Sequence, residues 1–470
     1  MTNNENEYIN EEELQDSLSS FKDMLKQKTS KYFEVHEFEY ILEYYIERND
    51  IANANLAIKY AMTIHPKSYE LYKKLAQVLI LSEDYEKAIR ISKKALKDFG
   101  EQADLDYFLV IGEAYLKTER IEDAEKAFYK ALKMADDEFY NICYSIAISY
   151  EQEDRHLKAI KYFKLIEEEN KNLLFDIAMS YYSLEDYKQS VSYFKKHLKH
   201  YVFSLESWFY QGKSLFSLSN YDEAIDAFEY VLSIDSQYTP ALYELAKLWV
   251  IKADYFKALE TYKEILLIEQ NPDNTFWLSL GDVYFNLERY VDARKTYLKV
   301  LKNDEESEDA FYSLSLIDIV EGEYRWAENH IKKAIAINSQ LPEFWVTLGN
   351  VQQFLFQEDR AEQSYLKAIQ LNPYFDLAWK SIVDFYFYAN DVIQALSYLV
   401  KSQTYIGESA EIYYKLTAFN LELQDLDKAV SFLEKALLLD ASQYKILYEY
   451  FPEAGDYKLI QKLINLYQKI

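Results

Sequence analysis

Apolar residues recur at helical spacing in the stretch "WLSLGDVYFNLERYVDARKTY", which begins at Trp277. Trp277, Leu280 and Tyr284 stand at i, i+3 and i+7, the period of one face of an α-helix. Gly281 lies in the middle of this pattern, where glycine costs roughly 1 kcal/mol relative to alanine. The same order, Trp, two residues, Leu, Gly, returns further along the chain in "WVTLGN" at Trp345. The pattern therefore predicts helices that recur at a fixed interval.

The interval is about 34 residues, a length that is typical of helical repeat units. Tetrapeptides that end in a small residue, such as "YVDA", occur twelve times along the chain. Their last residues are Ala54, Ala88, Ala124, Ala159, Ser190, Ala224, Ala258, Ala293, Ala327, Ala361, Ala395 and Ala429. The steps between neighbouring members of this series are 34, 36, 35, 31, 34, 34, 35, 34, 34, 34 and 34. Such regularity indicates an internal repeat array.

Each unit holds two helical patterns, and the first surrounds one small residue. These residues are Ala76, Gly112, Ala147, Ala178, Gly212, Ala246, Gly281, Ser315 and Gly349. Antiparallel helices approach closely only where the residues at their crossing are small. We therefore expect paired helices without β-sheet, with Gly281 buried at a crossing. The substitution Gly281→Leu is expected to destabilise the protein by roughly 1–3 kcal/mol or more through overpacking.

The repeating pattern resembles the tetratricopeptide repeat, which reads W-x2-L-G-x2-Y, then A-x3-F, over about 34 residues. Leu280, Gly281, Tyr284 and Ala293 match it after Trp277, and Tyr297 stands where the family has Phe; the units at Trp208 and Trp345 match again. The resemblance covers about residues 35 to 441. It implies an all-α, right-handed superhelical solenoid of about twelve helix-turn-helix repeats with degenerate caps.

The array predicts the organisation of the chain. We expect a disordered acidic tail over residues 1–12, an N-terminal capping helix over 13–34, repeats one to four over 35–170, repeats five to twelve over 171–441, and C-terminal capping helices over 442–470. The step from Ala159 to Ser190 is only 31 residues, about one helical turn short. An irregular joint with few apolar contacts is therefore expected between residues 166 and 175. Residues 1–166 and 172–470 would then open as separate cooperative blocks.

Composition excludes several classes of partner. The formal net charge of −27 disfavours nucleic acids and anionic membranes. The single cysteine, Cys143, precludes an internal disulfide and favours a reducing, cytoplasmic location. No signal peptide is recognised at the N-terminus, and no stretch approaches 18 uncharged apolar residues, so no membrane span is predicted.

The sequence offers little catalytic chemistry. It has no glycine-rich phosphate loop and no zinc motif. His197 and His200 are the closest histidine pair, but they follow lysines near a helix end, where cations are favourable for structural reasons. Neither a metal, a cofactor nor an enzymatic activity is predicted. The run "NDEESED" over residues 303–309 is either a solvated connection or a contact for a basic partner or a cation.

The resemblance implies that the first helices line a concave groove which receives an extended or helical segment of another protein. Aromatic side chains are the usual anchors of such interfaces. The predicted groove residues are Tyr144, Phe175, Tyr182, Phe209, Lys213, Phe216, Tyr243, Lys247, Phe285, Tyr312, Asn350, Phe354, Phe387, Tyr388 and Tyr414. Alternatively, these side chains pack against neighbouring units and close the groove. The lysines and asparagines of the family's clamp for acidic C-terminal tails are not reproduced here.

The sequence thus predicts a non-catalytic scaffold or adaptor that binds a segment of a partner protein. The alternative is an enzyme, or a regulatory or substrate-recruiting subunit of an enzyme or chaperone complex. Nucleic-acid binding by the solenoid is a weaker hypothesis because of the negative charge.

Overall fold

The protein is helical throughout the part that the computed structural model describes, which is residues 11–27, 29–100, 105–168 and 170–468. No β-strand occurs in these ranges, so the predicted all-α fold is confirmed. The chain divides into two compact units, residues 1–244 and 245–470, with the boundary inside α14 (Thr239–Ile251). The tail predicted over residues 1–12 falls mostly outside the described residues, and α1 already begins at Glu11.

The helices have the following bounds. The first unit contains α1 (Glu11–Gln27), α2 (Val35–Glu47), α3 (Ile51–Ile64), α4 (Tyr69–Leu81), α5 (Tyr85–Phe99), α6 (Asp106–Lys117), α7 (Ile121–Met134), η2 (Asp136–Glu138), α8 (Phe139–Glu151), α9 (His156–Ile166), α10 (Leu173–Ser183), α11 (Tyr187–Leu198), α12 (Leu205–Ser217) and α13 (Tyr221–Ile234). The second unit contains α15 (Tyr255–Ile268), α16 (Asn274–Asn286), α17 (Tyr290–Asn303), α18 (Glu308–Val320), α19 (Tyr324–Ile337), α20 (Pro342–Phe354), α21 (Glu358–Leu371), α22 (Asp376–Tyr388), α23 (Val392–Ile406), α24 (Ala410–Glu422), α25 (Leu426–Asp440), η3 (Ala441–Tyr444), α26 (Lys445–Tyr450), η4 (Pro452–Asp456) and α27 (Lys458–Tyr467).

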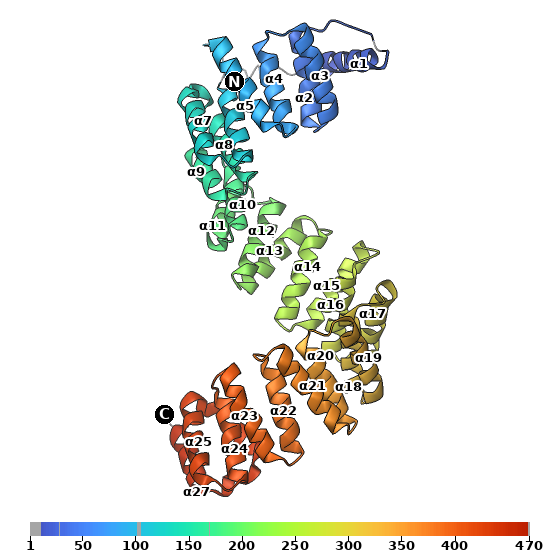
Figure 1. The fold of residues 1–470 in the computed structure, drawn as a ribbon, viewed down its shortest axis with the longest axis vertical. Coiled ribbons are helices and arrows are strands. Elements are labelled where there is room, and N and C mark those ends of the chain that lie inside the picture. Colours follow the sequence, from blue (N-terminus) through green and yellow to red (C-terminus); the bar gives the residue numbers. More distant parts are fainter. Residues whose placement is uncertain (1–10, 28, 101–104, 169, 469–470) are drawn as a thin grey trace. The chain divides into compact units, whose positions relative to one another are not determined.

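Within each unit the helices lie side by side in antiparallel pairs, such as α6 with α7 and α20 with α21 (Figure 1). Every turn inside a pair has one residue with positive φ, five residues before the small residue of the second helix. At Ala253, with φ of 56°, the turn closes with hydrogen bonds from Ala253 N to Val250 O and from Asp254 N to Trp249 O, both 2.9 Å. The carboxylate of Asp254 then caps α15 by accepting from Lys257 N at 3.2 Å. One short turn therefore ends the first helix and begins the second.

The two helices of a pair cross at the small residue identified in the sequence. A Cβ atom added to Gly281 would lie 2.3 Å from Cε1 of Tyr297, which is sixteen residues further on and 1% exposed. Glycine faces an aromatic ring in the same way at Gly112, Gly212 and Gly349. Alanine is also followed by an aromatic residue sixteen positions later at Ala147, Ala178 and Ala246, whereas an aliphatic residue follows the larger Ser315, Val383 and Thr417, in the pairs with Ile331, Leu399 and Leu433. The predicted burial of Gly281 at a crossing is confirmed, and the volumes of the two facing residues compensate one another.

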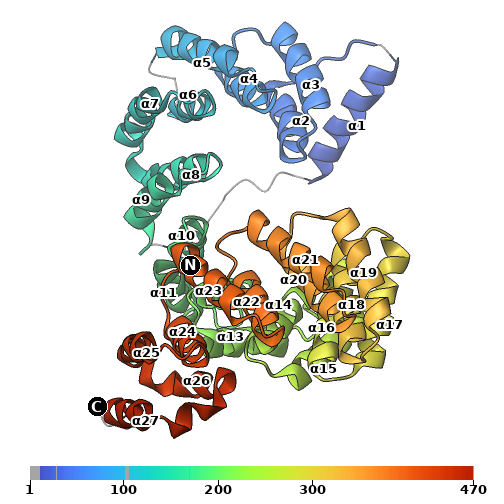
Figure 2. The ribbon, with the colours of Figure 1, turned by 60° about the horizontal axis from the view of Figure 1, so that its bottom comes forward.

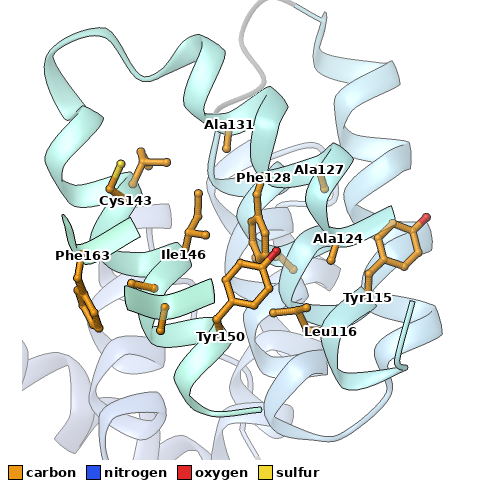
Figure 3. Packing of buried hydrophobic residues seen from close by; sticks show 14 of the residues in the cluster. Tyr115, Leu116, Ala124, Ala127, Phe128, Ala131, Cys143, Ile146, Tyr150 and Phe163 are labelled. Atoms are coloured by element: carbon orange, nitrogen blue, oxygen red, sulfur yellow. The ribbon is translucent and has the colours of Figure 1, made fainter. Parts of the chain in front are cut away.

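The core between neighbouring pairs is built from the small and aromatic residues of the second helix in each pair. Figure 3 shows Phe128 of α7 facing Tyr150 of α8, with ring centroids 5.5 Å apart. Ala124 and Ala131 flank Phe128 on α7, and both are fully buried. The small alanines let the neighbouring helix approach, and the aromatic rings fill the space between them.

The joint between residues 166 and 175 is shorter than the others, but its apolar core is continuous. Helices α9 and α10, on either side of it, have 11 residues each. Ile166, Leu173 and Leu174 are buried and belong to one core cluster that extends on both sides of the joint. The structure therefore does not show the expected loss of apolar contacts, and its compact units divide at residue 244 instead. Separate opening of the two predicted blocks stays a prediction.

Additional helices cover both ends of the array. Phe21 and Met24 of α1 are buried in one cluster with Phe38 of α2. At the other end, α26 and α27 lie beside α24 and α25, where they bury Leu447 and Ile460 (Figure 2). Here η4 separates the two last helices at Pro452 and Gly455. The apolar faces of the terminal repeats are thereby covered, as a repeat array requires.

Candidate binding groove

Three successive first helices of the second unit, α18, α20 and α22, line one groove of about 810 Å³. The lining comprises Leu316, Ile319, Thr347, Asn350, Gln353, Phe354, Phe356, Glu358, Ser381, Asp384, Phe385, Tyr388 and Ala389. Its volume falls within the range of roughly 300–1,000 Å³ that is typical of ligand sites. It can therefore hold several side chains of a peptide segment.

The regular repeat period explains why these side chains converge. Leu316, Asn350 and Asp384 each follow the small residue of their helix by one position. Ile319 and Gln353 occupy the position three residues later, on the same helical face. Equivalent positions of stacked repeats share one surface, so a groove forms wherever their side chains leave space.

Three exposed aromatic side chains contribute to the apolar surface of the groove, beside Leu316 and Ile319. Phe354, Phe356 and Tyr388 are 54%, 89% and 71% exposed. The ring of Phe354 stacks on Tyr324 at a centroid distance of 4.6 Å and an interplanar angle of 9°. This stacking holds the ring in place while one face stays open to solvent, as an anchor for a partner requires.

Phe356 combines an exposed ring with the left-handed backbone conformation that the turn of each pair adopts. Its φ of 57° lies in the left-handed region, which bulky L-residues rarely adopt. The equivalent turn position is Gly322 in the preceding pair and Asn390 in the following one, and both residue types accept this conformation readily. The same left-handed φ recurs at this turn position in the other pairs, for example at Glu83, Glu119 and Glu288, so the backbone conformation belongs to the repeat and does not itself mark a binding site. Neither packing nor turn geometry requires a phenylalanine here, which favours a role in binding.

The polar part of the groove is fixed by hydrogen bonds from behind. The hydroxyl oxygen of buried Tyr365 lies 2.8 Å from Asn350 Oδ1 and 3.2 Å from Gln353 Oε1, and its single proton is shared between these two acceptors. Both amide oxygens are therefore occupied, and the amide N–H groups are left as donors. Asp384 accepts from Lys415 Nζ at 3.1 Å and from the Tyr450 hydroxyl at 2.7 Å. Its charge is thus compensated within the protein.

Three carboxylates stand in a row on α16, α18 and α20. Loss of hydration raises the pKa of Asp282, and the charge of Asp309 raises it further, although the Tyr297 hydroxyl, which donates to Asp282 Oδ1 at 2.7 Å, opposes this. Loss of hydration also raises the pKa of Asp309, and the charges of Glu308 and Glu343 add to the effect. No Lys, Arg or His of the described residues forms an ion pair with Asp282, Asp309 or Glu343. This row carries negative charge that the described residues do not balance.

The structure divides the fifteen predicted groove residues into different groups. Asn350, Phe354 and Tyr388 line the groove together. Tyr144 and Lys247 are exposed, and eight others are half-buried: Phe175, Tyr182, Lys213, Phe216, Tyr243, Phe285, Tyr312 and Phe387. In the first unit, Lys213 Nζ lies 5.9 Å from the ring centroid of Tyr182.

Two of the predicted residues are buried and are not available to a partner. Tyr414 is 0% exposed, and its hydroxyl donates to Asp440 O at 2.9 Å. Phe209 is 8% exposed, with its ring against Phe228 and Tyr238. These two side chains pack against neighbouring elements, which is the alternative that the sequence left open for the predicted groove residues.

Sequence reasoning missed several lining residues. Asp384 occupies the phase that selected Asn350, so the same rule would have found it. Gln353 and Ile319 share one phase, three residues further along their helices. Phe356 lies in a turn, outside the helical positions that the repeat phase selects, and only the structure shows that its exposed ring borders the groove.

The residues considered for other chemistry are structural. His197 is 6% exposed, and its Nδ1 lies 2.8 Å from Ser207 Oγ. Cys143 is fully buried. Over the described ranges, no group of three or more His, Cys, Asp or Glu side chains is arranged to hold a metal ion. Likewise, no helix in these ranges combines the length and apolarity needed to cross a membrane.

Comparisons with known proteins return one kind of relative. A sequence model of the tetratricopeptide repeat matches residues 73–139, 175–239 and 243–308, and a second model of this repeat matches 342–375 and 410–443, together more than half of the chain. A TPR repeat-containing protein of Methanocaldococcus jannaschii is 26% identical over 405 residues. The match covers 85% of this chain and spans only 64% of that protein's length.

Solved structures with similar folds include yeast Tom70 and a tetratricopeptide repeat protein from Parabacteroides merdae ATCC 43184. Tom70 is 14% identical with a TM-score of 0.45, and the match covers 85% of this chain and 97% of Tom70. The Parabacteroides protein is 17% identical with a TM-score of 0.43, and the match covers 56% of this chain and 99% of that protein. At TM-scores below 0.5, these two likenesses add nothing to the assignment of function.

Proposed function

Because the chain belongs to the tetratricopeptide repeat family, we propose that it is a non-catalytic scaffold that binds a segment of another protein in the groove of α18, α20 and α22. Protein interaction is the general role of this family of repeats. The more specific part of the proposal is that the binding site lies in this groove. The cytoplasmic location expected from the single cysteine stays a prediction.

The observation that carries the proposal is the exposure of three aromatic rings on one groove. Phe356 is 89% exposed, at a turn position that holds Gly or Asn in the two adjacent pairs and Glu in several others. Beside it, Phe354 and Tyr388 expose two more rings to the same groove. A partner side chain that covers these rings would bury apolar surface at about 25 cal/mol per Å². Binding therefore accounts for aromatic residues that folding does not require.

The proposal is tested with Phe356→Asn in the full chain. Asparagine relieves the left-handed strain, so this variant is expected to be more stable than wild type by about 1 kcal/mol while it loses a binding anchor. Tyr388→Ala removes a second anchor. Phe256→Ala is the matched control, because Phe256 is 74% exposed on α15, outside the groove lining.

Each tagged variant is used to purify partners from cells of the source organism. We expect at least one protein to be captured by wild type and by Phe256→Ala, and to be lost with both Phe356→Asn and Tyr388→Ala. An increase in melting temperature for Phe356→Asn shows that the loss is not due to misfolding. If all four proteins capture the same set, the groove is not the binding site and the proposal is wrong.

A further inference from the structure

The charged side chains that line the groove are all acidic. Its lining contains the carboxylates of Glu358 and Asp384 and no Lys, Arg or His. Lys415 already neutralises Asp384, whereas Glu358 forms no ion pair with any described residue. The apolar rings of the groove are thus accompanied by unbalanced negative charge.

The row of Asp282, Asp309 and Glu343 continues this charge beyond the groove. Asp309 precedes the lining residue Leu316 by seven positions on α18. Glu343 precedes Asn350 by seven positions on α20. Residues seven apart on a helix lie on the same face, two turns from each other. Asp309 and Glu343 therefore lie towards the N-terminal ends of the helical faces that line the groove, and Asp282 lies on the preceding first helix, α16.

No cationic side chain among the described residues balances the negative charge of this row. Its carboxylates come from three successive repeats and act on one another through their charges. Like charges held close together repel one another, and a cation bound beside them would relieve this repulsion. Asp309 belongs to the acidic run 303–309, for which the sequence left open a basic partner.

We propose that the occupant of the groove is a cationic, apolar segment of another protein. In this proposal, which rests on the proposed function, apolar side chains of the segment cover Phe354, Phe356 and Tyr388. Its Lys or Arg side chains reach Asp282, Asp309 and Glu343. Apolar contact supplies most of the affinity, while charge complementarity excludes acidic segments.

The test is a selection from a displayed library of random peptides, each long enough to span the three helices of the groove. The library is bound to the full wild-type chain after depletion on the double variant Phe356→Asn/Tyr388→Ala. We expect the enriched peptides to combine aromatic or large aliphatic residues with Lys or Arg and to lack Asp and Glu. Individual peptides are then synthesised and their dissociation constants measured by fluorescence anisotropy.

Two triple variants separate the local charge from the overall charge. Asp282→Asn/Asp309→Asn/Glu343→Gln removes the row, and Glu260→Gln/Glu264→Gln/Glu434→Gln removes three exposed carboxylates elsewhere in the same unit. The first triple is expected to weaken the enriched peptides about tenfold, since each exposed ion pair contributes roughly a factor of two to three. The second triple is expected to change binding less than about twofold.

The outcomes distinguish the two proposals. If no peptide is enriched after depletion, the groove does not bind segments and the proposed function itself is wrong. If the enriched peptides are acidic or uncharged, or if both triple variants weaken binding equally, the groove binds segments but the cationic partner is wrong. Enrichment of cationic apolar peptides that only the first triple variant weakens supports the inference.

Discussion

The contact between Gly281 and Tyr297 gives a quantitative test of how the repeats are held together. In the variant Gly281→Val, the new Cβ atom would lie 2.3 Å from Cε1 of Tyr297, far inside van der Waals contact. Overpacking of this kind costs about 1–3 kcal/mol. A gain in helix propensity of less than about 1 kcal/mol offsets part of that cost. We expect a net destabilisation of about 1–2 kcal/mol.

A second substitution is expected to relieve this clash. Tyr297→Leu removes the ring and the hydroxyl that donates to Asp282, and by itself it should destabilise the protein by about 2–4 kcal/mol. The double variant Gly281→Val/Tyr297→Leu copies the pair Val383 and Leu399, which fills the same crossing in a later repeat. Valine then occupies space that the ring has left. The double variant should be more stable than the sum of the single effects by about 1–3 kcal/mol.

The assay is urea denaturation of the full chain, followed by far-UV circular dichroism for wild type and the three variants. The four free energies of unfolding form a double-mutant cycle, in which changes in helix propensity cancel. If the two single effects add to within about 0.5 kcal/mol, the residues do not compensate in volume and the explanation of the glycine is refuted.

Three further predictions concern charge, the C-terminal cap and cooperativity. Burial, followed by the charge of Glu151, raises the pKa of Asp176 to about 6, so wild type should gain stability as the pH falls through 6 and level off below the ordinary value of 3.8. In pH-dependent thermal denaturation Asp176→Asn should abolish this gain, and an unchanged profile would contradict the assignment. Lys415→Met leaves Asp384 without its cation and should destabilise the second unit by about 3–5 kcal/mol in urea denaturation. Because Tyr450 of α26 donates to Asp384, hydrogen exchange in α26 should become faster, and exchange there at the wild-type rate would count against this prediction. Hydrogen exchange across residues 140 to 230 tests the predicted blocks, since a step near residue 170 supports separate opening and one uniform value refutes it.

Most of the fold can be predicted from the sequence because each repeat is specified by local contacts. The regular period places every helix pair, and the small residue at each crossing identifies which faces meet. Both features depend on residues within one or two units of each other, so a single chain records them. The compensation between Gly281 and Tyr297 is also present in the sequence as a spacing of sixteen residues, although its meaning is evident only from the distance between them.

The candidate site could be predicted only in part. Of the residues that the repeat phase selected, Asn350, Phe354 and Tyr388 line one groove, and their role in binding stays a prediction. The same reasoning selected Tyr414, which is fully buried and donates to Asp440 O at the end of α25. Phase determines the face on which a side chain lies, but exposure depends on which other elements cover that face.

What the sequence by itself determined is therefore the helix pairs, their order and the residues at their crossings. The tertiary structure decided which part of the inner surface stays open. It shows that the rings of Phe354, Phe356 and Tyr388 are uncovered, that Asp384 is neutralised by Lys415, and that the carboxylates of successive repeats act on one another. The physical reason is that exposure and charge compensation are sums over neighbours in space, including neighbours distant in the chain.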